Sequence, residues 1–234
     1  MRCIIVLICT MMINSAAFAQ SFKTRQLTFE RVKDAYQLKW PDLEKKIIGA
    51  GFGSEFSMFI TAYKQEGLLD IWLKNKKNKE YTLFKSYKFC EHSGTLGPKF
   101  REGDLQTPEG FYYINVFNPL SSFHLSLGIN YPNPTDVLRS GKEPPGTDIY
   151  IHGNCVTVGC IPLTDDLIKE VYVLGVEAKN NGQEKIPVYI YPFKMSEENY
   201  KKFIVSYPAH TKFWASLKEE YARFNKQRTL RNDL

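Results

Sequence analysis

The sequence predicts an α+β fold, a mainly β domain with helices at both ends. Short apolar segments between about Phe52 and Phe193 alternate or run together as strands do. Gly, Pro and Ser gather between residues 93 and 148, which predicts short strands joined by long surface loops. Apolar residues at helical spacing occupy the two ends. We therefore expect an N-terminal helical segment at 20–50, a β-rich domain at 51–194 and a C-terminal helical extension at 195–234.

The first half of the chain predicts one helix followed by a β-hairpin. Ala35, Leu38, Trp40 and Leu43 lie at helical spacing in a helix expected over 28–50. Strands are expected at 52–63, 68–74 and 81–90. The polar, basic segment 75–79 joins the last two, which is the pattern of a hairpin turn.

The second half predicts further strands around one well-marked helix. Strands are expected at 110–117, 122–128 and 147–152, the last ending at Gly153. Thr164 offers a capping hydroxyl before two acidic residues, so a helix should begin there and continue to Lys179. A last strand is expected at 186–191, and a basic, aromatic helical region from Ser196 to about Asn225.

Residues 1–19 have the features of a secretory signal peptide. Met1-Arg2 supplies a positive charge, an apolar run follows to Ile13, and Ala17-Phe18-Ala19 is a small-x-small cleavage site. The run is shorter than the roughly 20 residues of a membrane-spanning helix, so an uncleaved anchor is the lesser alternative. We expect export across the inner membrane to the periplasm or cell envelope, with no integral span after cleavage before Gln20.

Composition excludes several classes of protein. The 234 residues are 43% hydrophobic and 24% charged, which suits one sizeable core rather than a disordered chain. The net charge of +6 is mild and its basic residues are dispersed, so we expect no nucleic-acid partner.

Three cysteines remain after signal cleavage: Cys90, Cys155 and Cys160. An odd number in an oxidising compartment implies at least one free thiol. That thiol is either a small buried hydrophobe or a nucleophile, and its neighbours must decide.

The segment 149–160 concentrates the chemistry. A strand delivers His152 to its end, and a short loop returns to Cys160 just before the expected helix start at Thr164. A thiol near a helix N-terminus is favoured as thiolate, and a nearby His can take and return its proton. Gly159 permits close approach of the backbone to a substrate carbonyl, so amides there could form an oxyanion hole.

Other roles for these side chains compete with catalysis. Cys155 and Cys160 could form a disulfide if geometry allowed. His152, Cys155 and Cys160 could bind zinc, although a fourth ligand is missing. Cys90 and His92 form a second Cys/His pair without a helix start or glycine, so we expect Cys90 to be a core thiol.

These residues resemble the active-site motif of the L,D-transpeptidase catalytic domain (YkuD-type) family, most closely its compact YafK-like branch. His152-Gly153 and Thr157-Val158-Gly159-Cys160 match the family's His-Gly and Ser/Thr-x-Gly-Cys. Thr107-Pro108-Glu109-Gly110 is similar to its upstream Thr-Pro-x-Gly turn. Further likenesses lie at 96–99, 122–127 and 131–133.

The resemblance implies a β-sandwich or barrel with a helix after the catalytic cysteine. It also implies that Cys160 forms a thioester at the L-centre of the third residue of a peptidoglycan stem peptide. His152 would be the base, and backbone around Gly159 would hold the oxyanion. An amine acceptor would give a 3-3 cross-link or attach a protein, whereas water would make the enzyme an L,D-carboxypeptidase or release a wall-linked protein. No cofactor or metal is implied, and the substrate-binding residues carried over are His124, Gly153, Thr157, Tyr131 and Asn133.

Two positions depart from the family pattern. Val158 stands where the commoner pattern has a second His, and Pro162 where it has Arg or Asn, which leaves open how a substrate carboxylate is held. A non-catalytic wall-binding module with a structural Cys160 is the alternative from another class. A papain-like protease is disfavoured, because its Cys precedes its His in the chain.

Overall fold

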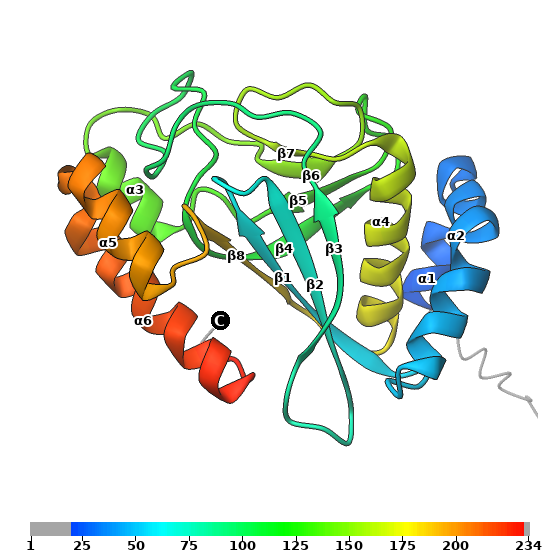
Figure 1. Ribbon diagram of the computed structural model, residues 1–234. Helices are drawn as coiled ribbons and strands as arrows, with labels where there is room; N and C mark the ends of the chain where they lie inside the picture. Colours follow the sequence, from blue (N-terminus) through cyan, green and yellow to red (C-terminus); the bar gives the residue numbers. More distant parts are fainter. Residues whose placement is uncertain (1–19, 232–234) are drawn as a thin grey trace, which may run out of the picture.

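The computed structural model describes residues 20–231; the predicted signal peptide at 1–19 lies outside this range. The strands form one mixed eight-stranded sheet in the order β3-β2-β1-β8-β4-β5-β6-β7 (Figure 1). They are β1 Phe56–Tyr63, β2 Leu68–Asn75, β3 Thr82–Lys88, β4 Gly110–Asn118, β5 Ser126–Ile129, β6 Tyr150–His152, β7 Ile161–Pro162 and β8 Ile186–Tyr191. The helices are α1 Phe22–Gln26, α2 Glu30–Gly49, α3 Pro134–Ser140, α4 Asp165–Asn180, α5 Glu197–Ser206, the 3-10 turn η1 Pro208–His210 and α6 Thr211–Gln227.

Strand pairing follows the polar turns of the sequence. β1, β2 and β3 form an antiparallel meander, and the predicted hairpin around 75–79 is confirmed. Two pairs are parallel, β1 with β8 and β6 with β7. The second of these pairs positions the two candidate catalytic residues, because His152 ends β6 and Cys160 directly precedes β7.

Alternation along the central strands divides the core into two layers. Met58 and Ile60 of β1 pack with the cluster that includes α4, whereas Phe59 between them packs with α6. Strand residues alternate between the two faces of a sheet, so one strand supplies both cores. α4 covers one face, with α1 and α2 on its outer side, and α5 and α6 cover the other (Figure 1). Both terminal helical segments therefore belong to the packed fold.

The sheet is curled so strongly that its two edge strands approach each other. Cys90 follows β3 at one edge, and its N–H donates to the carbonyl of Pro162 in β7 at the opposite edge, at 3.2 Å. This curl brings the loop after β3 beside the loop that leads to Cys160. The predicted α+β class is confirmed, with a helix after Cys160 and helices at the C-terminus.

Several predicted boundaries need correction. The strand expected at 122–128 begins only at Ser126, because His124 adopts a left-handed conformation with φ 67°. The strand expected from 147 begins at Tyr150, because Asp148 is likewise left-handed with φ 60°. α3 was not predicted, although Asn133 as a capping residue before Pro134 is a recognised start signal. Within residues 20–231, none of the helices combines the length and apolar character that crossing a membrane requires.

Candidate active site

The parallel pair β6–β7 sets the relative positions of His152 and Cys160. Its register places Ile151 opposite Ile161 and His152 opposite Pro162. Cys160 therefore lies beside the start of β6, and His152 lies near its end. The loop from 153 to 159 closes the connection, and Gly159 in it has φ 140°.

The thiol of Cys160 bonds to the backbone that enters β6. The Tyr150 N–H donates to Sγ at 3.4 Å, and Sγ donates to the Asp148 carbonyl at 3.5 Å. Burial raises the pKa of the Cys160 thiol, and the Asp148 charge adds to this effect. The Tyr150 N–H and the Lys99 charge oppose it. In this arrangement the cysteine favours its protonated form, which corrects the expectation that the nearby helix start would favour the thiolate: burial of the sulfur outweighs that effect.

His152 is oriented as a base by its own backbone. The ring is buried against Phe123, with 4.8 Å between ring centroids, and Nδ1 lies 2.5 Å from the carbonyl oxygen of Gly153. A carbonyl can only accept, so Nδ1 carries the proton and Nε2 of the neutral ring presents a lone pair. Burial lowers the pKa of His152, which keeps the ring neutral.

Thr157 and Gly159 shape the turn before Cys160. The Thr157 hydroxyl donates to the Cys160 carbonyl at 2.8 Å and accepts from the Gly159 N–H at 3.1 Å. A Cβ at Gly159 would lie 2.9 Å from the Gln106 carbonyl oxygen, so this position requires glycine. Because the Gly159 N–H is already occupied, the Cys160 N–H is the better candidate for an oxyanion donor.

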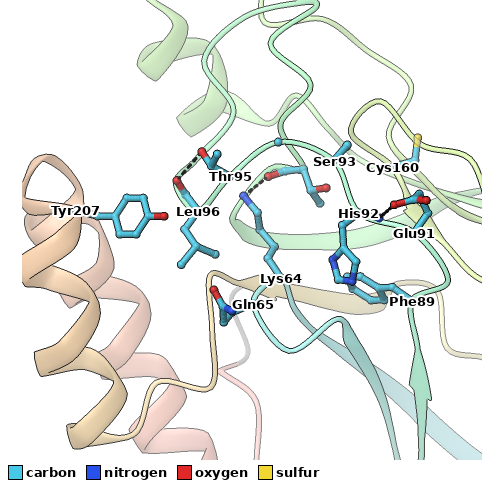
Figure 2. A pocket seen from close by; sticks show the side chains of 12 residues that line it. Lys64, Gln65, Phe89, Glu91, His92, Ser93, Thr95, Leu96, Cys160 and Tyr207 are labelled. Carbon is cyan, nitrogen blue, oxygen red and sulfur yellow. Dashed lines mark hydrogen bonds between the residues drawn. The ribbon is translucent and has the colours of Figure 1, made fainter.

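Cys160 lies between two cavities. The smaller, of about 250 Å³, is shown in Figure 2 and is lined by Lys64, Gln65, Phe89, Glu91, His92, Ser93, Gly94, Thr95, Leu96, Thr107 and Tyr207. The larger, of about 520 Å³, is lined by Lys99, Glu102, Gly103, Leu105, Gly146, Thr147, Asp148, Ile149, Val158 and Gly159. A substrate chain could thus occupy both sides of the sulfur.

A buried ion pair fixes one wall of this site. Lys64 Nζ donates to the carbonyls of Gly97 and Thr107 and to Glu109 Oε1, at 2.7, 2.9 and 3.1 Å. The other Glu109 oxygen accepts from Trp214 Nε1 of α6 at 2.8 Å. The sequence marked Glu109 only as part of a turn and gave no sign of Lys64 or Trp214. Their contact joins the C-terminal helices to the walls of the smaller cavity.

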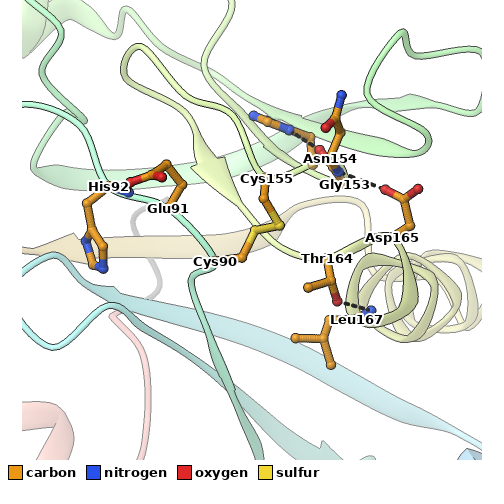
Figure 3. Close-up of a disulfide and its surroundings, with 10 residues drawn as sticks. Cys90, Glu91, His92, Gly153, Asn154, Cys155, Thr164, Asp165 and Leu167 are labelled. Carbon is orange, nitrogen blue, oxygen red and sulfur yellow. Dashed lines mark hydrogen bonds between the residues drawn. A yellow bond between two sulfur atoms is a disulfide. The ribbon is translucent and has the colours of Figure 1, made fainter.

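The expectation that Cys90 is a core thiol was wrong. Cys90 forms a disulfide with Cys155, with 5.4 Å between their Cα atoms (Figure 3). The curl of the sheet brings the end of β3 to the loop 153–159, which the linear sequence could not show. Because Cys155 is used in this way, a Cys155–Cys160 disulfide and a zinc site that includes Cys155 are also incorrect. Cys160 is free.

The predicted substrate-binding residues lie in two places. Gly153 and His124 are beside His152: a Cβ on Gly153 would lie 3.1 Å from the His124 Cβ. The buried His124 Nε2 has no hydrogen-bond partner among the described residues.

None of the five residues carried over as substrate-binding lines either cavity at Cys160: His124, Gly153, Thr157, Tyr131 and Asn133. The Tyr131 hydroxyl donates to the Pro145 carbonyl at 2.7 Å, and Asn133 caps α3 through its side chain. The structure thus places His124 and Gly153 beside His152, places Thr157 beside Cys160, and gives Tyr131 and Asn133 local hydrogen bonds elsewhere. Across residues 20–231, no group of three or more His, Cys, Asp or Glu side chains is placed to hold a metal ion.

Comparison with known proteins identifies the family of this chain. Residues 60–190 match the model of the YkuD family, the L,D-transpeptidase catalytic domain. The chain belongs to this family. It is 38% identical over 173 residues to a protein of Escherichia coli (strain K12) named "Putative L,D-transpeptidase YafK", covering 73% of this chain and 68% of that protein.

Solved structures of lower similarity include the helical cell shape determining protein Pgp2 from Campylobacter jejuni. It is 24% identical, with a TM-score of 0.46 over 59% of this chain and 49% of that one. L,D-transpeptidase 1 of Mycobacterium tuberculosis is 13% identical, with a TM-score of 0.32 over 58% of this chain and 62% of that one. Membership of the L,D-transpeptidase family associates the chain with the cell envelope and with peptidoglycan as its substrate class.

Proposed function

We propose that this L,D-transpeptidase family member is a cysteine acyltransferase of the periplasm or cell envelope that acts on peptidoglycan stem peptides. The observation that carries the proposal is the β6–β7 register, which places a free thiol and an oriented base on neighbouring strands. Cys160 is the free cysteine among the described residues, and it lies next to the strand that ends in His152. Backbone bonding holds the His152 ring with Nε2 as its basic atom.

The first half of the reaction forms a thioester. His152 Nε2 takes the thiol proton as Cys160 Sγ attacks the carbonyl carbon at the L-centre of the third stem residue. The Cys160 N–H stabilises the oxyanion. When the C–N bond breaks, His152 returns the proton to the leaving amine, and the acyl group remains on sulfur.

The second half transfers the acyl group. An amine enters, loses a proton to His152 and attacks the thioester carbon. The C–S bond breaks, and His152 returns the proton to sulfur, which restores the thiol and the neutral ring. The product is a 3-3 cross-link between stem peptides or a protein attached to the wall. The cavities on both sides of Cys160 would hold the donor and the acceptor, and no cofactor or metal takes part.

A second candidate function is hydrolysis, and one feature of the cavities favours it. The two lysines that line them already have acidic partners, Lys64 with Glu109 at 3.1 Å and Lys99 with Asp104 at 2.6 Å. Pro162, where the family pattern has Arg or Asn, carries no charge. A leaving D-alanine would bring a carboxylate into the site, where no free cation among the described residues of the cavities could pair with it. An amide bond to a wall-linked protein would bring no such carboxylate. Release of such a protein by water suits this charge pattern.

The test uses purified tetrapeptide muropeptides and, in parallel, peptidoglycan that carries a covalently linked protein. Each is incubated with the protein or with Cys160→Ala, and the products are identified by mass spectrometry. Dimers formed only by the wild type support transfer. Tripeptide plus free D-alanine, or released protein, identifies hydrolysis at the same thiol.

Equal product from Cys160→Ala would refute the proposal. No product from either protein, with no alkylation of Cys160 in the folded chain, would instead favour a non-catalytic wall-binding module, because a structural cysteine resists labelling.

A further inference from the structure

In this structure the Cys160 thiol forms hydrogen bonds with backbone atoms and not with His152. Sγ donates to the Asp148 carbonyl and accepts from the Tyr150 N–H. Among the hydrogen bonds of the described residues, none joins Sγ to His152, whose Nδ1 is bound to Gly153. Figure 2 shows Sγ directed away from the Lys64 and His92 side chains that line the smaller cavity.

Asp148 adopts an unusual backbone conformation at this contact. Its φ of 60° lies in the left-handed region, which side chains other than Gly, Asn and Asp rarely occupy. The side chain is held locally: Oδ2 accepts from the Thr147 hydroxyl at 2.9 Å and Oδ1 from the Tyr150 hydroxyl at 3.4 Å. A left-handed conformation at a residue other than glycine costs free energy, and it persists only where the surrounding structure maintains it. Here the conformation turns the residue 148 carbonyl to the thiol.

The same residue places a negative charge beside the sulfur. Burial raises the pKa of the thiol, the Asp148 charge raises it further, and Lys99 acts in the opposite direction. The remaining titratable groups that line the two cavities are Glu102 on the Asp148 side and Lys64, Glu91, His92 and Tyr207 on the other.

We propose that Asp148 is a positioning residue that keeps the resting Cys160 thiol bound to backbone and apart from His152, so that the thiol turns to His152 only when substrate occupies the cavities. Its backbone supplies the acceptor for the thiol hydrogen, and its carboxylate disfavours a thiolate at that place. This inference rests on the proposed function of Cys160.

The proposal is tested by alkylation of the full chain with iodoacetamide between pH 6 and pH 10, with modification of Cys160 measured by peptide mapping. Because only the thiolate reacts, the rate follows its population. We expect His152→Asn to leave the alkylation rate unchanged although it abolishes turnover. If His152 were already hydrogen-bonded to the thiol, its removal would slow the alkylation of Cys160.

Two substitutions at Asp148 separate its carbonyl from its charge. Asn tolerates the left-handed conformation, so Asp148→Asn removes the charge and one of the two side-chain acceptors but keeps the backbone carbonyl in place. It should speed alkylation at pH 7.5 by about threefold. Asp148→Ala also disfavours that conformation and should speed it by about tenfold. Glu102→Gln, a charge removal in the same cavity, is the matched control and should match the wild type.

Slower alkylation of His152→Asn would overturn the proposal, and so would equal rates for Asp148→Ala and the wild type. If Asp148→Ala fails to fold, as shown by circular dichroism, the His152→Asn and Asp148→Asn rates still decide. These rates need no turnover, so their failure would leave the acyl-transfer function standing. Product formation by Cys160→Ala would refute that function separately.

Discussion

Replacing Lys64 by Met tests the buried ion pair beside the active site. The Lys64 side chain is only 7% exposed, and Glu109 is fully buried. The Lys64 ammonium donates three hydrogen bonds, two of them to the carbonyls of Gly97 and Thr107. Met has a similar length without the charge or the donors. The variant therefore leaves a buried carboxylate without its counter-ion.

The expected cost follows from burial. Breaking a buried pair by removing one partner costs about 3–5 kcal/mol, because the remaining charge is uncompensated. We expect Lys64→Met to lower the free energy of unfolding by about 4 kcal/mol. Glu109→Gln in the same chain removes the orphaned charge. Its amide oxygen can still accept from the Gly97 N–H or from Trp214 Nε1, although its NH2 group then faces the other donor. The double variant should therefore be more stable than the sum of the single effects predicts, by about 2 kcal/mol.

The measurement is urea unfolding followed by circular dichroism, on the wild type, both single variants and the double variant. Lys77→Met is the matched control, since Lys77 lies in the exposed turn after β2 and should change stability by less than about 0.5 kcal/mol. A Lys64→Met stability within about 1 kcal/mol of the wild type would refute the reasoning, because a lone buried carboxylate cannot be that inexpensive. Strictly additive single effects would also refute it, since they would show that the two charges do not interact.

Three further predictions concern the segment from His152 to Cys160. Reduction of Cys90–Cys155, or Cys155→Ser, should lower the free energy of unfolding by about 4 kcal/mol, because the bond closes a loop of 65 residues. Thermal melts with and without reductant measure this effect, and equal melting temperatures would contradict it. Gly159→Ala should reduce turnover by at least about tenfold, since its Cβ would meet the Gln106 carbonyl and shift the turn that aims the nucleophile; activity equal to the wild type would show that the turn is not needed. The apparent pKa of the acid limb of the kcat/KM pH profile should lie below 6.5, the ordinary pKa of histidine. Burial lowers the pKa of His152, so the base is lost only as pH falls through that lower value. An acid-limb pKa above 6.5 would contradict the assignment of His152 as the base.

Local patterns predicted most of the secondary structure. Alternating and continuous apolar runs gave β1, β2, β3 and β8, and the capping hydroxyl at Thr164 marked the start of α4. The predicted strand starts before β5 and β6 were wrong, because His124 and Asp148 adopt left-handed conformations that end the extended backbone. Apolar periodicity carries no signal for such conformations, and neither residue is a glycine.

The candidate pair could be proposed from the sequence because His152 and Cys160 lie close together in the chain. Lys64 was not, since its partners lie 33 to 45 residues away and meet it only when β1 joins the sheet. The Cys90–Cys155 pairing depends on the curl that brings opposite edges of the sheet together, and connectivity of cysteines cannot be deduced from sequence alone.

The central claim is that Cys160 carries the acyl group, and trapping that intermediate tests it most directly. The protein is mixed with a tetrapeptide muropeptide, quenched in acid within the first turnover, and its intact mass is measured. The account predicts a mass increase equal to the acyl fragment left after loss of the leaving amine. Peptide mapping should place it on Cys160, and Cys160→Ala should show none. An adduct on another residue, or turnover by Cys160→Ala, would contradict the account.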